Sequence, residues 1–569
     1  MSEPHQKSWW LYPKQPDLQK KLSESLNISP VIAQILINRG IDSVETAQFF
    51  LSPSLKNLPN PFFLPNMEKG VERIVEAIKR NETIAIYGDY DVDGLTSAAL
   101  LNLFFKEMGI TPLVYIPDRI KEGYGLQAAA LENLKKRGTS LVITADCGTK
   151  SHDAIKRAGE IGLDVIVTDH HELDAQASPA FAFVNPQLLS KGSLGQELAG
   201  VGVAFFLLLA LRQKLREQNL FKTLEPNLKQ HLDLVAMGTI GDMAPLTGIN
   251  RILVSFGLKE LAQSKKPGII ALKEAAKLKE GKTLVPSDIG FKLAPRINAG
   301  GRISQAQLGL DLLCCDDLER ARKLATILEQ CNQDRQGMQE RHLRQALEMA
   351  SQKETRFSFV VASKDWHPGI VGLVASKLTE NFYRPSIALS IEGEWARGSG
   401  RSISGIHIVE ILEGCKDLLE QFGGHTAAAG LTLRTEKIPE FEERFETLLS
   451  QKASQELYTP SIKVDYELKL AEISERFLTE LQTLQPFGIK NPEPVFLGRA
   501  LSLKEAKVVA EKHLKLKVAD DQNQLEAIAF NMGNRHPLAK ERGDLVFIPQ
   551  WNTYQEMRVI QLKIKDLKC

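Results

Sequence analysis

The chain has 569 residues, of which 43% are hydrophobic and 25% are charged, and its formal net charge at pH 7 is +1. This length and composition are ordinary for a protein that folds into several globular domains. The near-neutral balance excludes a chain that is basic throughout, so any binding of nucleic acid must come from local patches.

The sequence carries no signal for a membrane or for export. Its longest apolar run, residues 203–211, is too short to span a bilayer and is interpreted as a buried helix. The N-terminal segment MSEPHQKSWWLYP lacks the charged-then-apolar order of a secretory signal. The six cysteines form no CxxC pair and no framework spacing. We therefore expect reduced thiols, a cytoplasmic location and no membrane association.

The predicted elements divide the chain into five parts. Short helices at 30–39 and 44–51 belong to an N-terminal extension. Apolar strands that alternate with helices then predict a doubly wound parallel sheet. A stretch without proline, with apolar residues at helical spacing, predicts one long bridging helix. A second α/β domain follows, and a strand-rich C-terminal part suits a small barrel. The predicted bounds are 1–75, 76–313, 314–354, 355–455 and 456–569.

Local patterns predict four elements of the second α/β domain. Residues 357–362 and 386–390 are predicted to be strands, and residues 371–379 and 408–421 to be helices. The segment 398–402, GSGRS, is interpreted as a glycine-rich turn, whose backbone N–H groups and single guanidinium suit a phosphate.

Four short segments with acidic and histidine residues each follow an apolar run. They are GDYDVDG (88–94), ADCG (145–148), TDHH (168–171) and GDMAP (241–245). The first three runs predict buried parallel strands, and the fourth predicts a helix. Because open α/β sheets bind ligands at the carboxyl ends of their strands, these side chains are expected to meet there.

Carboxylates and imidazoles gathered in this way would repel one another without cations. Oxygen and nitrogen ligands favour Mn²⁺ or Mg²⁺, and two such ions can activate water for hydrolysis of a phosphoester. A single aspartate after a strand is more often a helix cap, and a histidine pair alone is more often structural. Four such segments are much harder to explain as turns, so we predict a site for two divalent metals.

The ordered motifs resemble those of the DHH phosphoesterase superfamily and, within it, the RecJ family of single-strand-specific 5′→3′ DNA exonucleases. The resemblance runs from about residue 39 to the C-terminus. One departure is Lys490, where the family pattern has glycine. The motifs that carry the resemblance are GDYDVDGLTS (88–97), PDRIKEGYGL (117–126), APRINAGGRI (294–303), WHPGIVGLVASKL (366–378), GSGRSI (398–403), GGHTAAAG (423–430) and PFGIKNPEPVF (486–496).

The resemblance implies a set of metal-binding and catalytic residues. Asp146 is the expected bridging ligand, and Asp169 is expected to orient a neighbouring ligand. His171 is expected either to bind a metal or to donate a proton to the scissile phosphate. The expected metal ligands are Asp89, Asp91, Asp93, Asp146, His170 and Asp242, and the expected catalytic residues are Asp91, Asp93, Asp146, His170, His171 and Asp242.

The resemblance also implies DHH, DHHA1 and OB-type domains and a surface for nucleic acid. Arginine suits such a surface because its planar fork binds phosphate through two hydrogen bonds. The expected phosphate-binding residues are Arg119, Arg302, Ser399, Arg401, Gly424 and His425, with Arg296 as a weaker candidate. In the C-terminal part the weaker candidates are Lys515, Trp551 and Tyr554, which suit tracking and stacking of a single strand.

We therefore expect a metal-dependent exonuclease of DNA repair and recombination that releases mononucleotides from single-stranded DNA. Two alternatives are a DHH phosphodiesterase for short or cyclic oligonucleotides and a non-enzymatic DNA-binding scaffold. Chains of the first kind are typically shorter and lack the barrel, and those of the second usually lose metal ligands. A monomer is expected, with a repair helicase or a single-strand-binding protein as a partner by family analogy alone.

Overall fold

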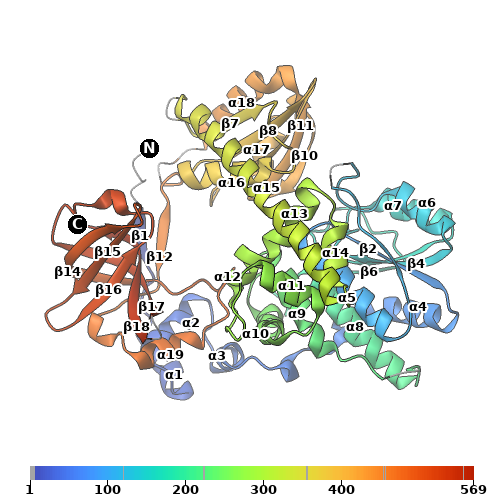
Figure 1. The fold of residues 1–569 in the computed structure, drawn as a ribbon, viewed down its shortest axis with the longest axis horizontal. Helices are drawn as coiled ribbons and strands as arrows, with labels where there is room; N and C mark the ends of the chain where they lie inside the picture. Colours follow the sequence, from blue (N-terminus) through green and yellow to red (C-terminus); the bar gives the residue numbers. More distant parts are fainter. Residues whose placement is uncertain are drawn as a thin grey trace. The chain divides into compact units, whose positions relative to one another are not determined.

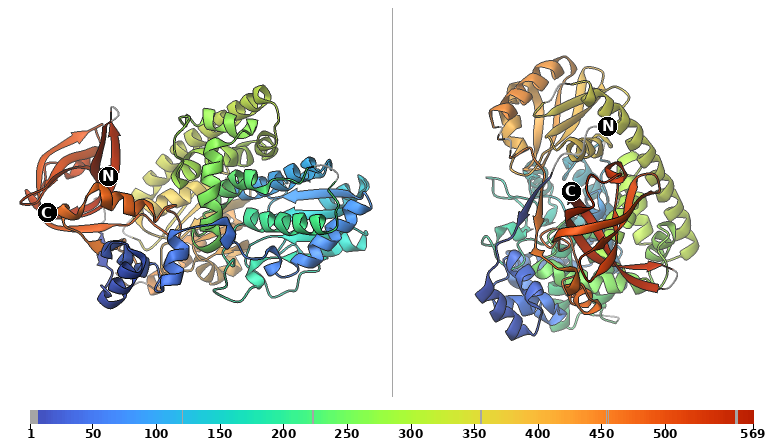
Figure 2. Two further views of the ribbon diagram at one scale, coloured as in Figure 1. Left: turned by 90° about the horizontal axis from the view of Figure 1, so that it is seen from below. Right: turned by 90° about the vertical axis from the view of Figure 1, so that its left-hand side faces the viewer.

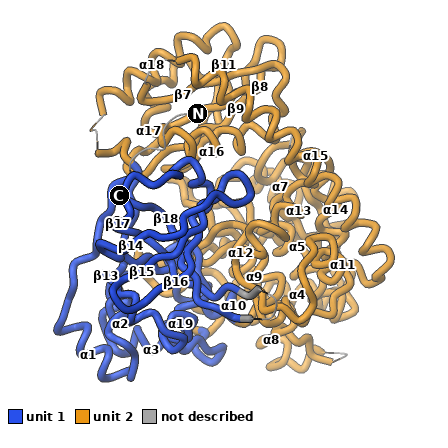
Figure 3. Tube along the Cα trace, turned by 60° about the vertical axis from the view of Figure 1, so that its left-hand side comes forward, with its two compact units in different colours: residues 1–58, 245–255, 460–569 blue, residues 59–244, 256–459 orange. Residues whose placement is uncertain are grey.

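The structure is a computed structural model that describes residues 7–119, 121–221, 224–353, 356–452, 454, 456–554 and 557–569. No helix in this described part of the chain is long and apolar enough to cross a membrane. The six cysteines are all free thiols. The chain forms two compact units, which Figure 3 shows in different colours. Unit 1 contains residues 1–58, 245–255 and 460–569, and unit 2 contains residues 59–244 and 256–459.

The first domain of unit 2 is built on a five-stranded parallel sheet. Its strand order is β3-β2-β4-β5-β6, so the chain changes direction between β2 and β4. In a doubly wound sheet this change of direction opens a crevice at the carboxyl ends of the strands. The strands are β2 (Thr83–Gly88), β3 (Leu113–Tyr115), β4 (Thr139–Ala145), β5 (Asp164–Thr168) and β6 (Ala182–Val184).

Helices cover both faces of this sheet, as predicted (Figure 1). One layer contains α4 (Met67–Lys79), α5 (Val92–Glu107) and α8 (Gly200–Glu217), which pack on one another. The other contains α6 (Ala128–Lys136) and α7 (His152–Glu160). The apolar runs that predict strands are buried between these layers, which is why they are apolar at nearly every position.

A group of helices follows and ends in one long helix. These are α9 (Leu232–Gly241), α10 (Gly248–Gln263), α11 (Pro267–Ala275), α12 (Pro286–Asp288), α13 (Ala294–Ile303), α14 (Gln307–Leu313) and α15 (Leu318–Ser351). The Asp317 side chain caps α15 by accepting a hydrogen bond from the backbone N–H of Arg320 at 2.6 Å. At 1.5 Å per residue α15 is about 51 Å long, and it packs on α13 at one end and on α16 at the other. It is the predicted bridging helix (Figure 1).

The second domain of unit 2 contains a five-stranded mixed sheet in the order β10-β11-β9-β8-β7. Its strands are β7 (Phe359–Ser363), β8 (Ser386–Glu392), β9 (Trp395–Arg401), β10 (Leu419–His425) and β11 (Ala428–Arg434). Its helices are α16 (Val371–Phe382), α17 (Ile408–Glu413) and α18 (Ile438–Gln451).

Two predictions for this domain are wrong. Residues 398–401 are not part of a turn but the end of strand β9, and glycine is required there by close packing. A Cβ at Gly398 would lie 2.4 Å from the carbonyl oxygen of Ala388 on β8. The predicted helix 408–421 ends at Glu413, because the chain after Lys416–Leu418 pairs with β11 as strand β10. Sheet pairing thus overrides the local helical pattern.

Unit 1 contains both the N-terminal and the C-terminal segments of the chain. Strand β1 (Ser8–Leu11) pairs in parallel with β12 (Ser461–Val464). The N-terminal helices are α1 (Pro16–Leu26), α2 (Pro30–Asn38) and α3 (Val44–Leu51). Their apolar side chains, such as Ile32 and Ile35, share one core with Leu516 and Phe547 of the C-terminal strands. The N-terminal residues are therefore a structural part of this unit.

The C-terminal strands of unit 1 close into the predicted barrel (Figure 2). Five strands follow the order β14-β15-β16-β18-β17, and β17 pairs with β14 to close the ring. The barrel strands are β14 (Phe496–Val509), β15 (His513–Ala519), β16 (Gln524–Ala529), β17 (Arg542–Tyr554) and β18 (Met557–Lys568), accompanied by β13 (Tyr466–Glu467) and α19 (Glu475–Gln482).

The departure at Lys490 has a local explanation. Lys490 lies in a tight turn in which the backbones of Gly488 and Asn491 exchange two hydrogen bonds of 2.8 and 3.1 Å. Its φ is +58°, in the left-handed region that glycine adopts freely and that costs other residues roughly 1–2 kcal/mol. Lysine here keeps the turn and adds backbone strain to it.

Candidate metal centre and phosphate pocket

The predicted metal-site residues of unit 2 lie at the ends of neighbouring elements. Asp89 and Asp91 follow β2, Asp146 follows β4, and Asp242 ends α9. Asp146 has a φ of +67°, which is unfavourable for a non-glycine residue. Backbone strain of this kind concentrates at functional sites, where the surrounding structure fixes the side chain in position.

These side chains form three overlapping groups, and within each group the possible ligand atoms lie within 4.8 Å of one another. Asp146 belongs to two of the groups, and His170 also belongs to two. The His170 Nε2 atom lies 3.2 Å from Asp146 Oδ1 and 3.7 Å from Asp242 Oδ2. The groups are Asp146–His170–His171, Asp93–His170–Asp242 and Asp89–Asp91–Asp146. Shared members make this arrangement suitable for two adjacent cations.

Three polar atoms of this cluster are buried and make no hydrogen bond to any described residue. They are Asp89 Oδ1, Asp146 Oδ1 and His170 Nε2. An unpaired buried polar atom is costly, and most such atoms in native proteins find a partner. All three can donate a lone pair to a cation, so the residues present fit divalent metals.

The electrostatics of the metal-free cluster point the same way. Burial, and then the neighbouring carboxylates, raise the pKa of Asp93 and of Asp242 to about 7. Burial also raises the pKa of Asp89 and of Asp146 well above the ordinary value. Burial lowers the pKa of His170, which keeps its imidazole neutral and able to bind a metal. The cluster therefore holds more negative charge than it can stabilise alone.

Two of the carboxylates also fix helix ends. Asp91 Oδ1 caps α5 by accepting from the backbone N–H groups of Asp93 and Gly94 at 2.9 and 3.2 Å. Asp93 accepts from the N–H groups of Gly200 and Val201, at the start of α8, at 2.7 and 2.9 Å. Helix N-termini favour negative charge, so these contacts orient the carboxylates and leave lone pairs free for a metal.

Asp169 has a different set of contacts. Its carboxylate accepts hydrogen bonds from the backbone N–H groups of Thr149 and His170, and it pairs with His171 Nδ1 at 2.7 Å. Burial opposes its charge, but the hydrogen bond with His171 and the positive imidazole lower its pKa. Burial likewise opposes protonation of His171, and the bond to Asp169 raises that pKa to about 9. Asp169 thus holds His171 rather than facing the cluster.

Sequence reasoning missed several residues that shape this site. Tyr124 is 44% exposed, and its hydroxyl lies 3.0 Å from His171 Nδ1. A Cβ at Gly200 would lie 2.3 Å from Asp146 Oδ1, and one at Gly238 would lie 2.6 Å from Asp93 Oδ1. In the sequence, Tyr124 is only one residue of a longer motif, and the two glycines are only members of apolar segments. No local signal therefore indicates that these residues lie so close to His171 and the aspartates.

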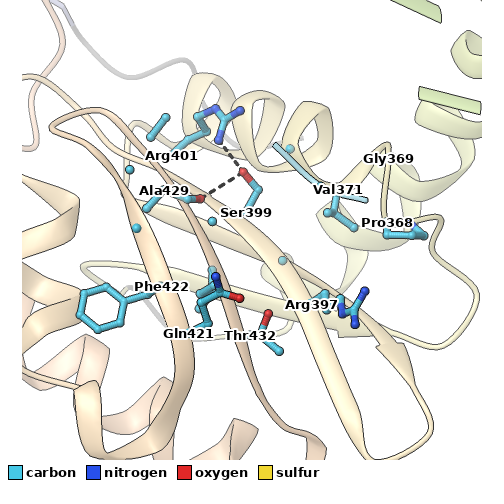
Figure 4. A pocket seen from close by; sticks show the side chains of 18 of the residues that line it. Pro368, Gly369, Val371, Arg397, Ser399, Arg401, Gln421, Phe422, Ala429 and Thr432 are labelled. Carbon is cyan, nitrogen blue, oxygen red and sulfur yellow. Dashed lines mark hydrogen bonds between the residues drawn. The ribbon is translucent and has the colours of Figure 1, made fainter. Parts of the chain in front are cut away.

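A pocket of about 660 Å³ contains most of the predicted phosphate-binding residues (Figure 4). Arg119, Arg302, Ser399, Arg401 and Gly424 all line it. The Arg401 guanidinium donates to Ser399 Oγ at 2.5 Å, and it lies beside the N-terminus of α16. The pocket thus combines guanidinium groups, a hydroxyl and a helix N-terminus, which together suit a phosphate.

The arginines of the pocket are not neutralised through ion pairs with described carboxylates. Among the described residues, Arg119, Arg302 and Arg401 form no ion pair, and Arg302 donates only to the carbonyl oxygen of Gly369, at 3.3 Å. Burial, and then the neighbouring Arg119, lower the pKa of Arg302 to about 9. Burial also lowers the pKa of Arg401. The positive charge of this pocket therefore suits an anion, just as the negative charge of the aspartate cluster suits cations.

The remaining candidates lie elsewhere. His425 does not line the pocket, but its Nδ1 lies 3.3 Å from Glu172 Oε2, next to His171 in the chain. Arg296 pairs with Glu329 of α15 at 2.6 Å. In unit 1, Lys515 pairs with Glu526 at 3.0 Å, and Trp551 packs on the barrel core. The Tyr554 side chain lies outside the described residues.

A doubly wound sheet that ends in aspartates and a histidine pair, joined to a second α/β domain, defines a DHH phosphoesterase. Family models agree: "DHH family, N-terminal domain" matches residues 83–239, "DHHA1 domain" matches 356–451 and "RecJ OB domain" matches 464–566. The single-stranded-DNA-specific exonuclease RecJ of Bacillus subtilis is 38% identical over 567 residues, covering 98% of this chain and 70% of the relative. The Escherichia coli enzyme of the same name is 37% identical, covering 89% of each chain.

Solved structures support the same assignment. The crystal structure of RecJ from Thermus thermophilus in complex with Mn²⁺ has a TM-score of 0.86 and 29% identity, and the match covers 99% of this chain and 79% of that one. A structure of exonuclease RecJ bound to manganese has a TM-score of 0.59 and 33% identity, covering 69% of this chain and 96% of that one. The chain belongs to the RecJ family.

Proposed function

We propose that this protein is a metal-dependent exonuclease that hydrolyses single-stranded DNA from its 5′ end to mononucleotides. The observation that carries this proposal is the arrangement of three carboxylate–histidine groups that share Asp146 and His170. Two divalent cations, Mn²⁺ or Mg²⁺, bind there; when bound, such ions activate water and stabilise both oxygens of an in-line phosphoryl displacement.

The chain's own residues position the metals and the substrate. We assign the metal ligands to Asp89, Asp91, Asp93, Asp146, His170 and Asp242, with Asp146 as the bridging ligand. Asp169 and Tyr124 hold His171, whose raised pKa keeps a proton available near the scissile phosphate. We assign the 5′-phosphate to Ser399 and Arg401, with Arg119 and Arg302 completing the positive wall.

Two features disfavour the alternatives. A phosphodiesterase for short or cyclic oligonucleotides has no use for a closed OB-type barrel, which this chain has in unit 1. A scaffold without activity has no need of a strained, buried aspartate with an unpaired oxygen, such as Asp146. Arg296 is ion-paired, and we therefore assign it to stabilising α15 rather than to DNA.

The test is digestion of end-labelled single-stranded and blunt duplex DNA with Mn²⁺, with Mg²⁺ and with chelator. We expect mononucleotides from the 5′ end of the single strand, slow reaction on the duplex, and none with chelator. Equal rates on both DNAs, or activity that survives chelation, would contradict the proposal.

We further propose a cytoplasmic monomer that acts in DNA repair and recombination, with a helicase or a single-strand-binding protein as a partner by family analogy. The free thiols fit a reducing compartment. Gel filtration with light scattering tests the monomer, and stimulation of digestion by a cognate single-strand-binding protein tests the partner.

A further inference from the structure

The pocket that holds Arg401 is larger than a phosphate needs. It extends along the open face of the sheet formed by β9, β11 and β10, and polar side chains line its far end (Figure 4). We propose that this far end is a subsite for one nucleoside located 5′ to the bound phosphate. The proposal rests on the proposed function. It says which DNA strands use the extra space.

Strand register arranges this face in three rows. The inner row is Arg401, Ala428 and His425, the middle row is Ser399, Gly430 and Gly423, and the outer row is Arg397, Thr432 and Gln421. Directly paired residues point to the same side of a sheet, so each row forms a line across the three strands.

The contact of His425 shows which side of the face is nearer the aspartate cluster. His425 belongs to the inner row and lies 3.3 Å from Glu172, which directly follows His171. The inner row is thus on the side of the aspartate cluster, and the outer row is on the side away from it. When a DNA strand has a phosphate in contact with Arg401 and Ser399, a nucleoside on the 5′ side of that phosphate lies at the outer row.

The middle row leaves room for such a group. A Cβ at Gly423 or at Gly430 would have no atom within 4 Å, so the floor between the inner and outer rows is open. Arg397 and Arg401 are four residues apart on one strand, or roughly 13 Å. A separation of this size is long enough for a sugar and its base. It suits them better than a second phosphate attached directly to the one that Arg401 binds.

The outer row has the chemistry that a nucleoside requires. Arg397 is exposed, and among the described residues its guanidinium makes no hydrogen bond or ion pair. Guanidinium groups stack on bases and donate to several acceptors at once. The Thr432 hydroxyl and the Gln421 amide can bond a sugar or a base edge without requiring one sequence.

The subsite matters for strands that begin with a 5′-hydroxyl. The charge-assisted contacts of Arg401, Arg302 and α16 are the strong ones in this pocket, and only a phosphate can make them. A 5′-hydroxyl strand can satisfy them with its first internal phosphate, provided that its terminal nucleoside moves to the outer row. Hydrolysis one phosphate further along then releases a dinucleoside monophosphate.

The chemistry of this shifted reaction is the same hydrolysis. Water adds to phosphorus, the P–O3′ bond breaks, and the leaving 3′ oxygen takes a proton. The released dinucleoside monophosphate has free 5′ and 3′ hydroxyls, and the shortened strand now carries a 5′-phosphate. Every later step then proceeds in the ordinary register and gives mononucleotides.

The experiment compares two single strands that begin with dA followed by dC, one with a 5′-phosphate and one with a 5′-hydroxyl. First products are identified by liquid chromatography and mass spectrometry in Mn²⁺. We expect dAMP from the phosphorylated strand and mainly the dinucleoside dApdC from the other. Release of free deoxyadenosine alone would overturn the subsite, whereas failure to digest the phosphorylated strand would overturn the proposed function instead.

Variants locate the subsite. Arg397→Ala should slow release of dApdC by about tenfold and leave release of dAMP from the phosphorylated strand within about twofold. Arg397→Lys should restore part of the loss. Arg444→Ala is the matched control, since Arg444 is an arginine of the same domain that is already paired with Asp417 at 2.7 Å. Equal losses on both strands, or no loss of dApdC, would show that the outer row binds no nucleoside.

Discussion

The aspartate cluster and the arginine pocket of unit 2 are opposites in charge and alike in construction. In the first, buried carboxylates are crowded, so that the pKa values of Asp93 and Asp242 rise to about 7. In the second, half-buried guanidinium groups are crowded, and burial together with this crowding lowers the pKa of Arg302 to about 9. In each site, the described residues of opposite charge do not balance the like charges that are gathered there.

This likeness shows how the fold divides the task. Helix ends, sheet register and glycine contacts hold like charges together in each site. This crowding raises the free energy of the protein without ligand, and binding a ligand of opposite charge lowers that free energy again. The aspartate cluster is completed by cations, and the pocket by a phosphate. The following predictions test whether the two sites behave as independent halves of one mechanism.

The largest expected effect is that of Asp146→Ala on catalysis. Losing a residue that merely orients a ligand costs about 10–100-fold, so losing the bridging ligand should cost more than about 100-fold. Binding of 5′-phosphorylated DNA, measured in chelator by fluorescence anisotropy, should be unchanged because the arginine pocket is intact. Asp153→Ala, at an exposed position of α7, is the control. More than a few per cent of wild-type activity at saturating Mn²⁺ would refute the bridging role.

The second prediction concerns stability against pH without metal. Unfolded aspartates lose protons near pH 4, but folded Asp93 and Asp242 keep theirs up to about pH 7. Between these values the folded chain binds more protons, so the free energy of unfolding falls as pH rises. His171 acts with the same sign between pH 6.5 and about 9, since it is protonated only in the folded chain.

Thermal unfolding in chelator should therefore begin several degrees lower at pH 9 than at pH 5, because the free energy of unfolding falls by several kcal/mol. Mn²⁺ should remove most of this dependence, because it replaces the missing protons. Asp242→Asn should flatten the chelator curve. A stability that rises with pH in chelator would show that the cluster is not crowded with charge.

The third prediction concerns Arg401→Ala and the other half of the comparison. Losing one charge-assisted contact costs roughly 1.5–3 kcal/mol, which is about one to two decades in affinity for 5′-phosphorylated DNA. The loss should be smaller for 5′-hydroxyl DNA, because an internal diester carries less charge. Metal binding, measured by calorimetry, should not change. Equal losses on both DNAs would mean that end recognition lies elsewhere.

The smallest effect is expected for Arg296→Ala. Arg296 is already paired with Glu329, so its charge is not available to a phosphate. The Michaelis constant for single-stranded DNA should change by less than about threefold, while the free energy of unfolding should fall by about 1–3 kcal/mol, because the largely buried Glu329 loses its partner. A tenfold rise in the Michaelis constant would place Arg296 on the DNA-binding surface.

The sequence predicted the parts of the fold that depend on local patterns. The parallel strands, the bridging helix and the aspartates at strand ends all follow from short periodic runs, and the structure contains them. The strand ending at Arg401 and the helix ending at Glu413 were predicted wrongly, because residues 395–401 and 419–425 pair with the neighbouring strands β8 and β11. In both segments sheet pairing overrides the local glycine-rich or helical pattern.

The candidate site divides in the same way. Residue types that bind metal or phosphate can be predicted from their chemistry, and most of these residues do lie together. The contributions of Gly200 and Tyr124 depend on how closely a backbone or a ring approaches Asp146 and His171. Such approaches are set by the packing of several elements, so the sequence alone gives no sign of them.

The pairing of β1 with β12 also constrains how the chain folds during synthesis. Residues 8–58 emerge first, but their strand and core partners lie after residue 460. Roughly 400 residues separate them, which at about 5–20 residues per second is roughly 20–80 s of translation. During that time apolar α2 has no partner core, so we expect unit 2 to fold first and the nascent N-terminal helices to be the segment that chaperones protect.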